Sequence, residues 1–522
     1  MKLNKKILSL IAISTICIGC DNSNNSSSNS NNNLKEKLAK VEISNSQNNG
    51  QVINPENVIL EETLYTIENK KLQNLQVLPS TGDVNILVIP ILLPDYKVID
   101  INNDGKDDSY DILTDINDAF FGEKNHKFES VKSFYKKSSY GKLNIGGEVT
   151  EWFDVEEWTD YKTASSIDAP QTYDLVREAV NWAKNIMKID MSKYDNDRDG
   201  YIDGVWCIYS APNLKNGGPQ TDYGNYWAYT SWGNQDNSIE KPNVNNPIYN
   251  LFGWASYDFM YDGYGIEHID AHTYIHETGH FLGLNDYYSD NMSYNPIGKI
   301  DMMDGNVTDL NSYSKMLLGW TKPYLVTGNA SIDLKTMHNE NSLIVIPSDS
   351  ITIKDNKFDP FSEYILIEYY TNEALNNSDS INEYSNGFQA PQSNGVRIYH
   401  VDNRKFIADA TNEYNMTCKE YQGETLTKTK KLVLPITNKR GMDNYNFYFN
   451  LDINVNLYDE IRMIEATNID TFSSGGIQKE KSLFKQNDEF SLDKYGENFF
   501  INKNKFNNGD SFSYKIKIGE VI

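Results

Sequence analysis

Residues 276–286 read His276-Glu277-Thr278-Gly279-His280-Phe281-Leu282-Gly283-Leu284-Asn285-Asp286, the pattern H-E-x-x-H-x-x-G-x-x-D. Because residues four apart share one face of a helix, His276 and His280 can bind one zinc ion. Glu277 lies beside them and can act as the general base toward a water at that ion. Gly283 permits a sharp turn that ends the helix, and this turn can bring Asp286 back as a third ligand. Three protein ligands leave one position open, which is the catalytic form of a zinc site.

The short pattern H-E-x-x-H also arises by chance in helices that bind no metal, and the added Gly283 and Asp286 make zinc the better interpretation. His272 is a rival ligand because it extends the same helical face. A helix rises about 1.5 Å per residue, so His272 and His280 begin about 12 Å apart along its axis. Zinc–nitrogen bonds are only about 2.0–2.1 Å long, so we expect His272 to serve in packing or behind the ligands.

The motif resembles that of the immune inhibitor A-like metallopeptidases, a branch of the metzincins with Asp as the third zinc ligand. The resemblance implies a Met-turn beneath the zinc, and Ile300–Gly305 is similar to that turn with Met303 in the matching place. A buried core methionine is the alternative interpretation of Met303. Some metzincins use a tyrosine to stabilise the oxyanion, and the sequence does not choose among Tyr287, Tyr288 and Tyr313.

Other segments between about residues 84 and 405 also resemble the family, whereas the extreme C-terminus does not. They are Phe120–Gly122, Ser130–Tyr135, Ser138–Leu143, Asn225–Trp227, Lys315–Trp320 and Gly395–Asp402. The resemblance implies a zinc endopeptidase that acts on protein or peptide substrates. It also implies a metzincin-like catalytic domain, in which a twisted sheet packs on helices and a cleft separates an upper from a lower part.

Two loops carry the alternating oxygen side chains that calcium prefers. The first offers four carboxylates and a backbone carbonyl, from Asp195, Asp197, Asp199, Tyr201 and Asp203. Gly200 permits its turn, and Trp206 at position twelve excludes an ordinary EF-hand. The loop is similar to a shorter calcium loop of the family. An acidic surface turn is the alternative.

The second loop has the same spacing but falls where the family resemblance is weakest. Its candidate calcium ligands are Asp100, Asn102, Asp104, Lys106 through its carbonyl, and Asp108. Asp111 even places an acid at position twelve. We therefore predict a second, weaker calcium site.

The whole chain has 522 residues, a formal net charge of -25 and a pI near 4.7. This length predicts two or three domains. The acidic balance argues against nucleic acid as a partner, because phosphate binding needs a basic surface. It fits a secreted protein, although a solvated acidic surface explains most of the charge.

Cys207 lies in an apolar run and is expected to be a buried free thiol, and a disulfide with Cys418 is not demanded.

The N-terminus has the features of an export signal. Lys2, Lys5 and Lys6 precede the apolar stretch Ile7–Ile18, which is too short to span a membrane as a helix. Cys17-Ile18-Gly19-Cys20 resembles a bacterial lipobox, with Cys17 in place of the usual Leu. We predict that residues 1–19 are a lipoprotein signal peptide and that a lipid on Cys20 anchors the chain to a membrane. The alternative is an ordinary secretory signal, and both interpretations export the protein to the cell surface or the medium.

The mature chain divides into four predicted parts. Residues 20–50 are rich in Asn and Ser and are expected to form a flexible tether. Residues 51–83 are a short propeptide or an N-terminal arm, residues 84–325 the metallopeptidase domain, and residues 326–522 a β-rich, sandwich-like domain. The expected fold class is therefore α+β.

Periodicity places the main elements. The catalytic part has a central strand at Val84–Ile91, another at Gly204–Tyr209, and helical spacing at Phe128, Val131, Phe134 and Tyr135 and again at Val176, Ala179, Val180, Ala183 and Met187. The β-rich part has strands at Leu343–Ile346, Tyr364–Tyr369, Val396–Val401 and Lys431–Leu434, with no strong helix. The predicted function is a surface-anchored or secreted zinc endopeptidase. The alternative is a lipid-anchored, non-enzymatic adhesin or binding protein on a protease-like scaffold.

Overall fold

The computed structural model describes residues 36–45, 50–66, 77–102, 104–123, 128–222, 224–233, 241–261, 268–289, 293–382, 384, 387–409, 417–421, 423, 425, 427, 430–433, 438, 450–451 and 458–522. From Lys37 to Ile522 the chain packs as one compact unit. The predicted signal peptide, with Cys20, lies outside the described residues. In the described part of the chain, no helix has both the length and the apolar composition needed to cross a membrane.

The catalytic part is built on one mostly parallel sheet. Its strands are ordered β5-β4-β8-β11-β9 and span Leu143–Val149, Gly82–Leu92, Val205–Tyr209, Leu251–Ser256 and Tyr229–Trp232. The first four are parallel, and β9 runs antiparallel to β11 at the edge. The short strand β6 (Phe153–Asp154) extends the pairing of β4. The predicted strands at residues 84–91 and 204–209 are confirmed as β4 and β8, and their apolar runs follow from burial on both faces.

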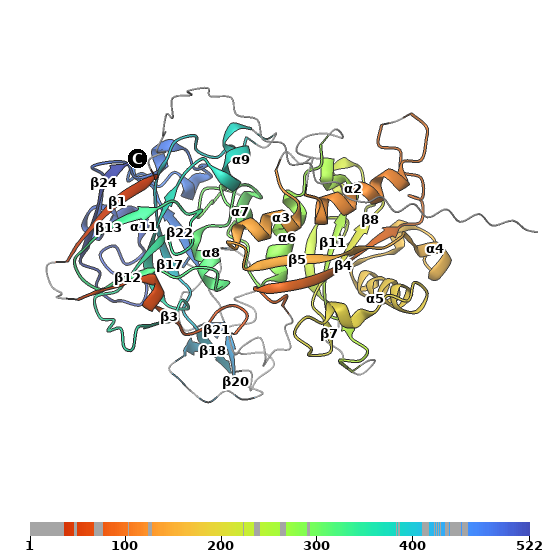
Figure 1. Cartoon of the computed structure of the whole chain (residues 1–522), viewed down its shortest axis with the longest axis horizontal. Coiled ribbons are helices and arrows are strands. Elements are labelled where there is room, and N and C mark those ends of the chain that lie inside the picture. The colour runs from red at the N-terminus through yellow and green to blue at the C-terminus, as the bar shows by residue number, and fades with distance from the viewer. Residues whose placement is uncertain are drawn as a thin grey trace, which may run out of the picture. The chain divides into compact units, whose positions relative to one another are not determined.

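Helices cover both faces of this sheet (Figure 1). The helices α2, α3 and α6 pack on one face and span Ser109–Phe121, Val131–Ser138 and His272–Phe281, whereas α5 (Ala169–Asn185) packs on the other. Alternate residues of β4 point to opposite faces, so Ile86 joins the core under α2 and Leu87 the core under α5. A capping box between Ser130 and Ser133 starts α3.

The β-rich part contains two sheets that share a core. The six-stranded sheet has the order β2-β12-β14-β16-β17-β22, with bounds Val52–Ile53, Tyr324–Val326, Leu343–Pro347, Glu363–Tyr370, Gly395–Asp402 and Ile461–Ile464. The four-stranded sheet has the order β13-β1-β24-β23, with bounds Ala330–Lys335, Leu38–Asn45, Tyr514–Val521 and Glu489–Phe490. Residues of both sheets, such as Ile367 and Ile516, lie in one hydrophobic cluster.

Strand β1 corrects the prediction of a flexible tether over residues 20–50. Leu38–Asn45 form an inner strand, in which Val41 pairs with Ile332 of β13 and Ile43 with Ile516 of β24. Ala39, Val41 and Ile43 alternate with polar residues and are buried. Three alternating apolar residues are enough to form a strand here, because β13 and β24 pair with β1 along both of its edges. Figure 1 shows β1, near the start of the chain, beside the C-terminal strand β24.

The N-terminal arm, residues 51–83, is built into the rest of the molecule. Strand β2 pairs with β12, and β3 (Ile59–Leu60) pairs with β15 (Lys357–Phe358). Farther along, the Leu64 amide donates to the Leu317 carbonyl at 2.8 Å, and the Leu78 amide donates to the Phe281 carbonyl at the end of α6 at 2.8 Å. Removing this arm would therefore take strands and hydrogen bonds from both parts of the fold.

The remaining elements are short. The small sheets are β10-β7 (Ile248–Tyr249, Tyr201–Ile202) and β20-β18-β19-β21 (Lys430–Val433, Phe406–Asp409, Thr417–Glu420, Asn450–Leu451). The other α-helices of the described residues are α4, α7, α8, α9 and α11 (Val155–Trp158, Met302–Gly305, Ser312–Leu317, Asn377–Ile381, Leu492–Phe499). Helix α11 was not expected in the β-rich part. The predicted strands there are confirmed as β14, β16, β17 and β20.

The two predicted domains share the largest hydrophobic core. Tyr274 and Met303, from before the predicted boundary at residue 326, lie in the same cluster as Leu366 and Tyr399, from after it. The structure is thus a mixed α/β fold with several sheets and few long helices, which is consistent with a peptidase domain. Helix α6 lies where the two parts meet (Figure 1).

Candidate active site

Helix α6 carries the first two predicted zinc ligands and ends where the sequence predicts. The Asp270 carboxylate accepts the His272 amide at 3.0 Å at its start. At its end Gly283 has a φ of +90°, and the Leu284 amide donates to the Gly279 carbonyl at 3.1 Å. This left-handed glycine reverses the chain. The reversal brings Asp286 back beside the helix.

The three predicted zinc ligands converge. Asp286 Oδ1 lies 3.0 Å from His276 Nε2 and 3.2 Å from His280 Nε2, and the ligand atoms of all three residues lie within 4.8 Å of one another. His276 and Asp286 are buried. Burial raises the pKa of the Asp286 carboxyl, but His280 and His276 outweigh this effect and hold it well below its usual range. Asp286 is therefore an anion that faces two imidazoles.

The second ring nitrogens set the tautomer of both imidazoles. His276 Nδ1 lies 2.7 Å from the Met302 carbonyl, and His280 Nδ1 lies 2.8 Å from the Leu284 carbonyl. A carbonyl only accepts, so each Nδ1 carries a proton, and when Nε2 loses its own proton it presents a lone pair. Two lone pairs and a carboxylate oxygen then face one point. Such a donor set fits zinc, and the two carbonyls are the orienting partners that histidine ligands need.

Glu277, the predicted general base, lies on helix α6, and its side chain contacts the edge strand β9. Its carboxylate is buried, and the Thr230 hydroxyl lies 2.9 Å from the Glu277 carbonyl and 3.2 Å from Oε2. Thr230 therefore ties the side chain and the backbone of Glu277 to β9. No local sequence pattern marks Thr230, because the contact joins residues 47 positions apart.

Met303, the predicted Met-turn residue, packs directly under the zinc helix. The Asp301 carboxylate accepts the Met303 amide at 2.8 Å and caps α7. A Cβ placed on Gly279 would overlap the Met303 sulfur, so α6 and the turn approach closely only because residue 279 is glycine. The same turn supplies the Met302 carbonyl to His276, so it orients a predicted zinc ligand as well as supporting the helix.

His272 lies outside the zinc ligand group, as expected. Its Nδ1 is 2.5 Å from Asp270, its Nε2 is 3.4 Å from Asp379, and its ring stacks on Phe128 with centroids 4.0 Å apart. Burial lowers the pKa of His272, but the two carboxylates raise it more, to about 10. His272 is thus a buried cation in a structural cluster.

The three candidate tyrosines lie in different surroundings. Tyr287 and Tyr313 are fully buried, and their hydroxyl groups bond to Ser314 and Glu460, each at 2.8 Å. Tyr288 is partly exposed, and its ring lies parallel to the His276 ring with centroids 6.4 Å apart. Of the three, Tyr288 is therefore the one whose ring faces the ring of a predicted zinc ligand.

The first predicted calcium loop gathers three of its carboxylates. Oxygen atoms of Asp195, Asp197 and Asp203 lie within 4.8 Å of one another, whereas Asp199 is not part of this group and instead accepts the Tyr201 amide at 2.9 Å. Asp203 is fully buried, and within the described structure its Oδ1 has no hydrogen-bond partner. Burial, followed by repulsion from Asp197, raises the pKa of Asp203 to about 8. An unpaired buried oxygen beside two other carboxylates fits a bound cation.

The second predicted loop has the same backbone hydrogen bonds as the first. Loop positions are counted from the first aspartate, which is Asp195 or Asp100. In both loops the side chain at position one accepts the backbone amides of positions five and six. The side chain at position three accepts the amide of position five, the one at position five accepts the amide of position seven, and the one at position nine accepts the amide of position two. The glycines at position six, Gly200 and Gly105, both have positive φ. The second loop is more exposed, however, and Asn102 replaces a carboxylate. The Lys106 ammonium also pairs with the Asp104 carboxylate at 2.5 Å. This pair neutralises part of the loop's negative charge, so the loop attracts a metal cation less strongly.

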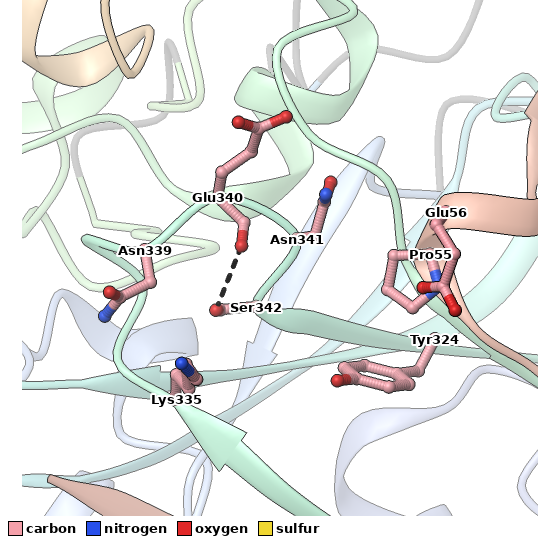
Figure 2. A pocket seen from close by; sticks show the side chains of 8 residues that line it. All are labelled: Pro55, Glu56, Tyr324, Lys335, Asn339, Glu340, Asn341 and Ser342. Atoms are coloured by element: carbon pink, nitrogen blue, oxygen red, sulfur yellow. Dashed lines mark hydrogen bonds between the residues drawn. The ribbon is translucent and has the colours of Figure 1, made fainter. Parts of the chain in front are cut away.

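The structure also contains a pocket of about 260 Å³ that none of these predicted residues lines (Figure 2). It lies between the N-terminal arm and the β12–β14 region, and its lining residues are Pro55, Glu56, Tyr324, Lys335, Asn339, Glu340, Asn341 and Ser342. Among the lining residues, the Ser342 hydroxyl donates to the Glu340 carbonyl at 3.4 Å. Cys207, elsewhere in the core, is a buried free thiol as expected, and the side chain of Cys418 lies outside the described structure.

Residues 85–307 match the family model of the immune inhibitor A peptidase M6 catalytic domain. The matched segment contains the three converging ligands, Glu277, Met303 and both acidic loops. The match supports a metallopeptidase of the immune inhibitor A type, which is a hydrolase that acts on proteins or peptides. No curated protein matches the chain.

Proposed function

We propose that this protein is a zinc-dependent endopeptidase of the metzincin type that hydrolyses peptide bonds of extracellular proteins. The observation that carries this proposal is the convergence of two imidazole nitrogens and the Asp286 carboxylate on one point. Without a metal, protonated imidazoles can pair with Asp286, and with neutral rings the same three atoms form a donor set that zinc prefers. The family match of the surrounding segment supports the same conclusion.

His276, His280 and Asp286 would hold the zinc ion. When bound there, zinc supplies a Lewis acid that lowers the pKa of a water molecule and polarises the scissile carbonyl. Glu277 accepts a proton from the attacking water and later delivers it to the leaving amine. Thr230 holds the Glu277 carboxylate in place. Tyr288 is the best placed of the three tyrosines to donate a hydrogen bond to the oxyanion.

The architecture supports the metzincin assignment. Helix α6, which carries the motif, packs on one face of a sheet of four parallel strands and one antiparallel edge strand. Met303 packs against this helix at Gly279. We further propose that the β-rich part is sandwich-like, since one hydrophobic cluster contains residues of both its larger sheets.

Calcium binding and export complete the proposal. The first acidic loop would hold a structural calcium ion through Asp195, Asp197 and Asp203, and the second loop a weaker one. The lipobox-like segment before Cys20 supports a cell-surface lipoprotein. A polar chain from Cys20 to the start of β1 at Leu38 would then join the anchor to the fold.

Metal analysis combined with proteolysis tests the main proposal. The purified protein should contain stoichiometric zinc and cleave a generic substrate such as casein. A chelator should remove both zinc and activity, and added zinc should restore them. A protein that binds zinc but cleaves no protein substrate would support the non-enzymatic alternative, and one that binds no zinc would refute the metal centre.

A further inference from the structure

The segment that joins the third ligand to the Met-turn is fastened to the C-terminal part of the chain. Backbone hydrogen bonds run from Met463 to the Pro296 carbonyl at 3.0 Å, from Asn295 to the Phe472 carbonyl at 2.9 Å, and from Gln478 to the Gly298 carbonyl at 2.9 Å. All the partner residues lie beyond residue 307, where the match to the peptidase catalytic domain ends. Residues 295–298 of this segment are therefore held by residues outside that match.

Two further side chains from the same region hold the neighbours of Asp286. The Asn285 amide donates from Nδ2 to Glu460 Oε2 at 2.9 Å. On the other side, Asn438 Nδ2 donates to the Tyr287 carbonyl at 2.9 Å and to the Ile461 carbonyl, also at 2.9 Å. The residues immediately before and after the third ligand are thus both tied to the start of strand β22.

Glu460 is a rigid and fully paired anchor. It is 2% exposed, and its second oxygen, Oε1, accepts the Tyr313 hydroxyl at 2.8 Å. Its backbone carbonyl accepts the Asp402 amide at 3.0 Å, and the next residue, Ile461, pairs with Val401 in the six-stranded sheet. Burial raises the pKa of Glu460 to about 7, and the hydrogen bonds from Asn285 and Tyr313 oppose this rise. A buried carboxyl fixed at both oxygens by a sheet keeps one position.

Asp286 depends on such positioning more than the two histidines do. His276 and His280 project from one helix, whereas Asp286 lies beyond the Gly283 turn. Its carboxylate must nevertheless face both Nε2 atoms at 3.0 and 3.2 Å. The backbone on either side of Asp286 therefore decides whether the third ligand reaches the metal.

We propose that Glu460 is a positioning residue of the metal centre, which holds Asp286 through Asn285, so that the C-terminal β-rich part completes the zinc site. This inference rests on the proposed zinc centre and assigns to the C-terminal part a role in metal retention. Glu460 does not touch the metal or substrate. Groups that orient metal ligands typically change metal affinity by about 10–100-fold when they are removed.

The test is the zinc dissociation constant of the full chain, measured by competition with a chelator. Glu460→Ala should weaken zinc binding by about 10–100-fold. Glu460→Gln should stay near wild type, because the amide keeps an acceptor for Asn285 and a donor for the Tyr313 oxygen. Asn285→Ala, at a partly exposed position, should reproduce the loss without a large effect on folding.

Glu465→Ala is the matched control. Glu465 is also a fully buried glutamate at the end of β22, but its carboxylate accepts the Thr471 hydroxyl at 2.8 Å and the Thr471 amide at 2.5 Å instead of contacting the zinc segment. Its loss should lower the melting temperature and leave the zinc dissociation constant unchanged. In the double variant of Asn285 and Glu460, the two losses should be less than additive, because both act through one hydrogen bond.

The outcomes separate this inference from the proposed function. Wild-type zinc affinity in Glu460→Ala, or an equal loss in Glu465→Ala, would overturn the positioning role and leave the zinc centre intact. A wild-type protein that binds no zinc would instead refute the centre on which the inference depends. Selective weakening in Glu460→Ala and Asn285→Ala, with Glu460→Gln spared, would support it.

Discussion

Deleting residues 1–49 should destabilise the protein strongly, whereas deleting residues 1–35 should not. The longer deletion removes β1, and with it the buried side chains of Ala39, Val41 and Ile43. Burying a valine or isoleucine contributes about 1.5–3 kcal/mol and one methyl group about 0.8 kcal/mol. The three side chains together therefore contribute about 4–7 kcal/mol. A typical domain has a total stability of about 5–15 kcal/mol, so this loss is a large part of the whole.

Loss of β1 also exposes two strand edges. β1 lies between β13 and β24, so its removal would leave the edge of each strand that faces β1 without hydrogen-bond partners. Unpaired edges bind other chains, so the longer deletion should aggregate as well as unfold more easily. The shorter deletion keeps both edges covered.

Urea unfolding and size-exclusion chromatography of the two truncated proteins measure both effects. The protein without residues 1–35 should unfold at the same urea concentration as the full mature chain and remain monodisperse. Equal unfolding midpoints for both truncations, with both soluble, would refute the inference that β1 is a structural strand and would restore the tether over residues 20–50.

Four further predictions concern the site, the loop and the anchor. Glu277→Gln should keep zinc but lose peptidase activity by several orders of magnitude in a casein assay, because proton transfer fails; near wild-type cleavage would contradict this role. Asp286→Ala should lower zinc content while His272→Ala leaves it nearly unchanged, and the reverse result in metal analysis would exclude the metzincin assignment. Asp197→Ala should lower the melting temperature in calcium buffer to that of the calcium-free protein, and a wild type that melts independently of calcium would remove the calcium loop. Cys20→Ser should abolish incorporation of a radiolabelled fatty acid, and an unlabelled wild type in the medium would indicate an ordinary secreted protein.

The features that the sequence predicts well are local ones. The ligand geometry follows from the four-residue spacing of two histidines on a helix and from one left-handed glycine, Gly283. The acidic loops are also local, since the side chains at positions one, three, five and nine accept amides at most seven residues away. Strands with long apolar runs, such as β4, β8 and β16, could be identified because burial on both faces leaves a continuous pattern.

The features that escaped prediction depend on distant partners. Strand β1 has only three alternating apolar residues, and its neighbours come from residues 330–335 and 514–521. Thr230 and Glu460 are ordinary polar residues until the fold brings them to Glu277 and Asn285. No pattern in a single sequence marks a contact between residues 175 positions apart. Helix α11 is short and has mixed polarity, so its amphipathic face emerges only against the core of the two sheets.

The position of β1 decides how the molecule carries mechanical load under the proposed N-terminal anchor. A pull transmitted through the chain before β1 would enter the fold at that strand, and the component of the force along the strand would be a shear load. The hydrogen bonds to β13 and β24 lie across the strand on both sides, so they are loaded together in shear and do not open one at a time. Drag on the enzyme while it holds a substrate would therefore be borne by the four-stranded sheet. A load from a held substrate would enter the fold at the candidate active site on helix α6 and leave it through β1.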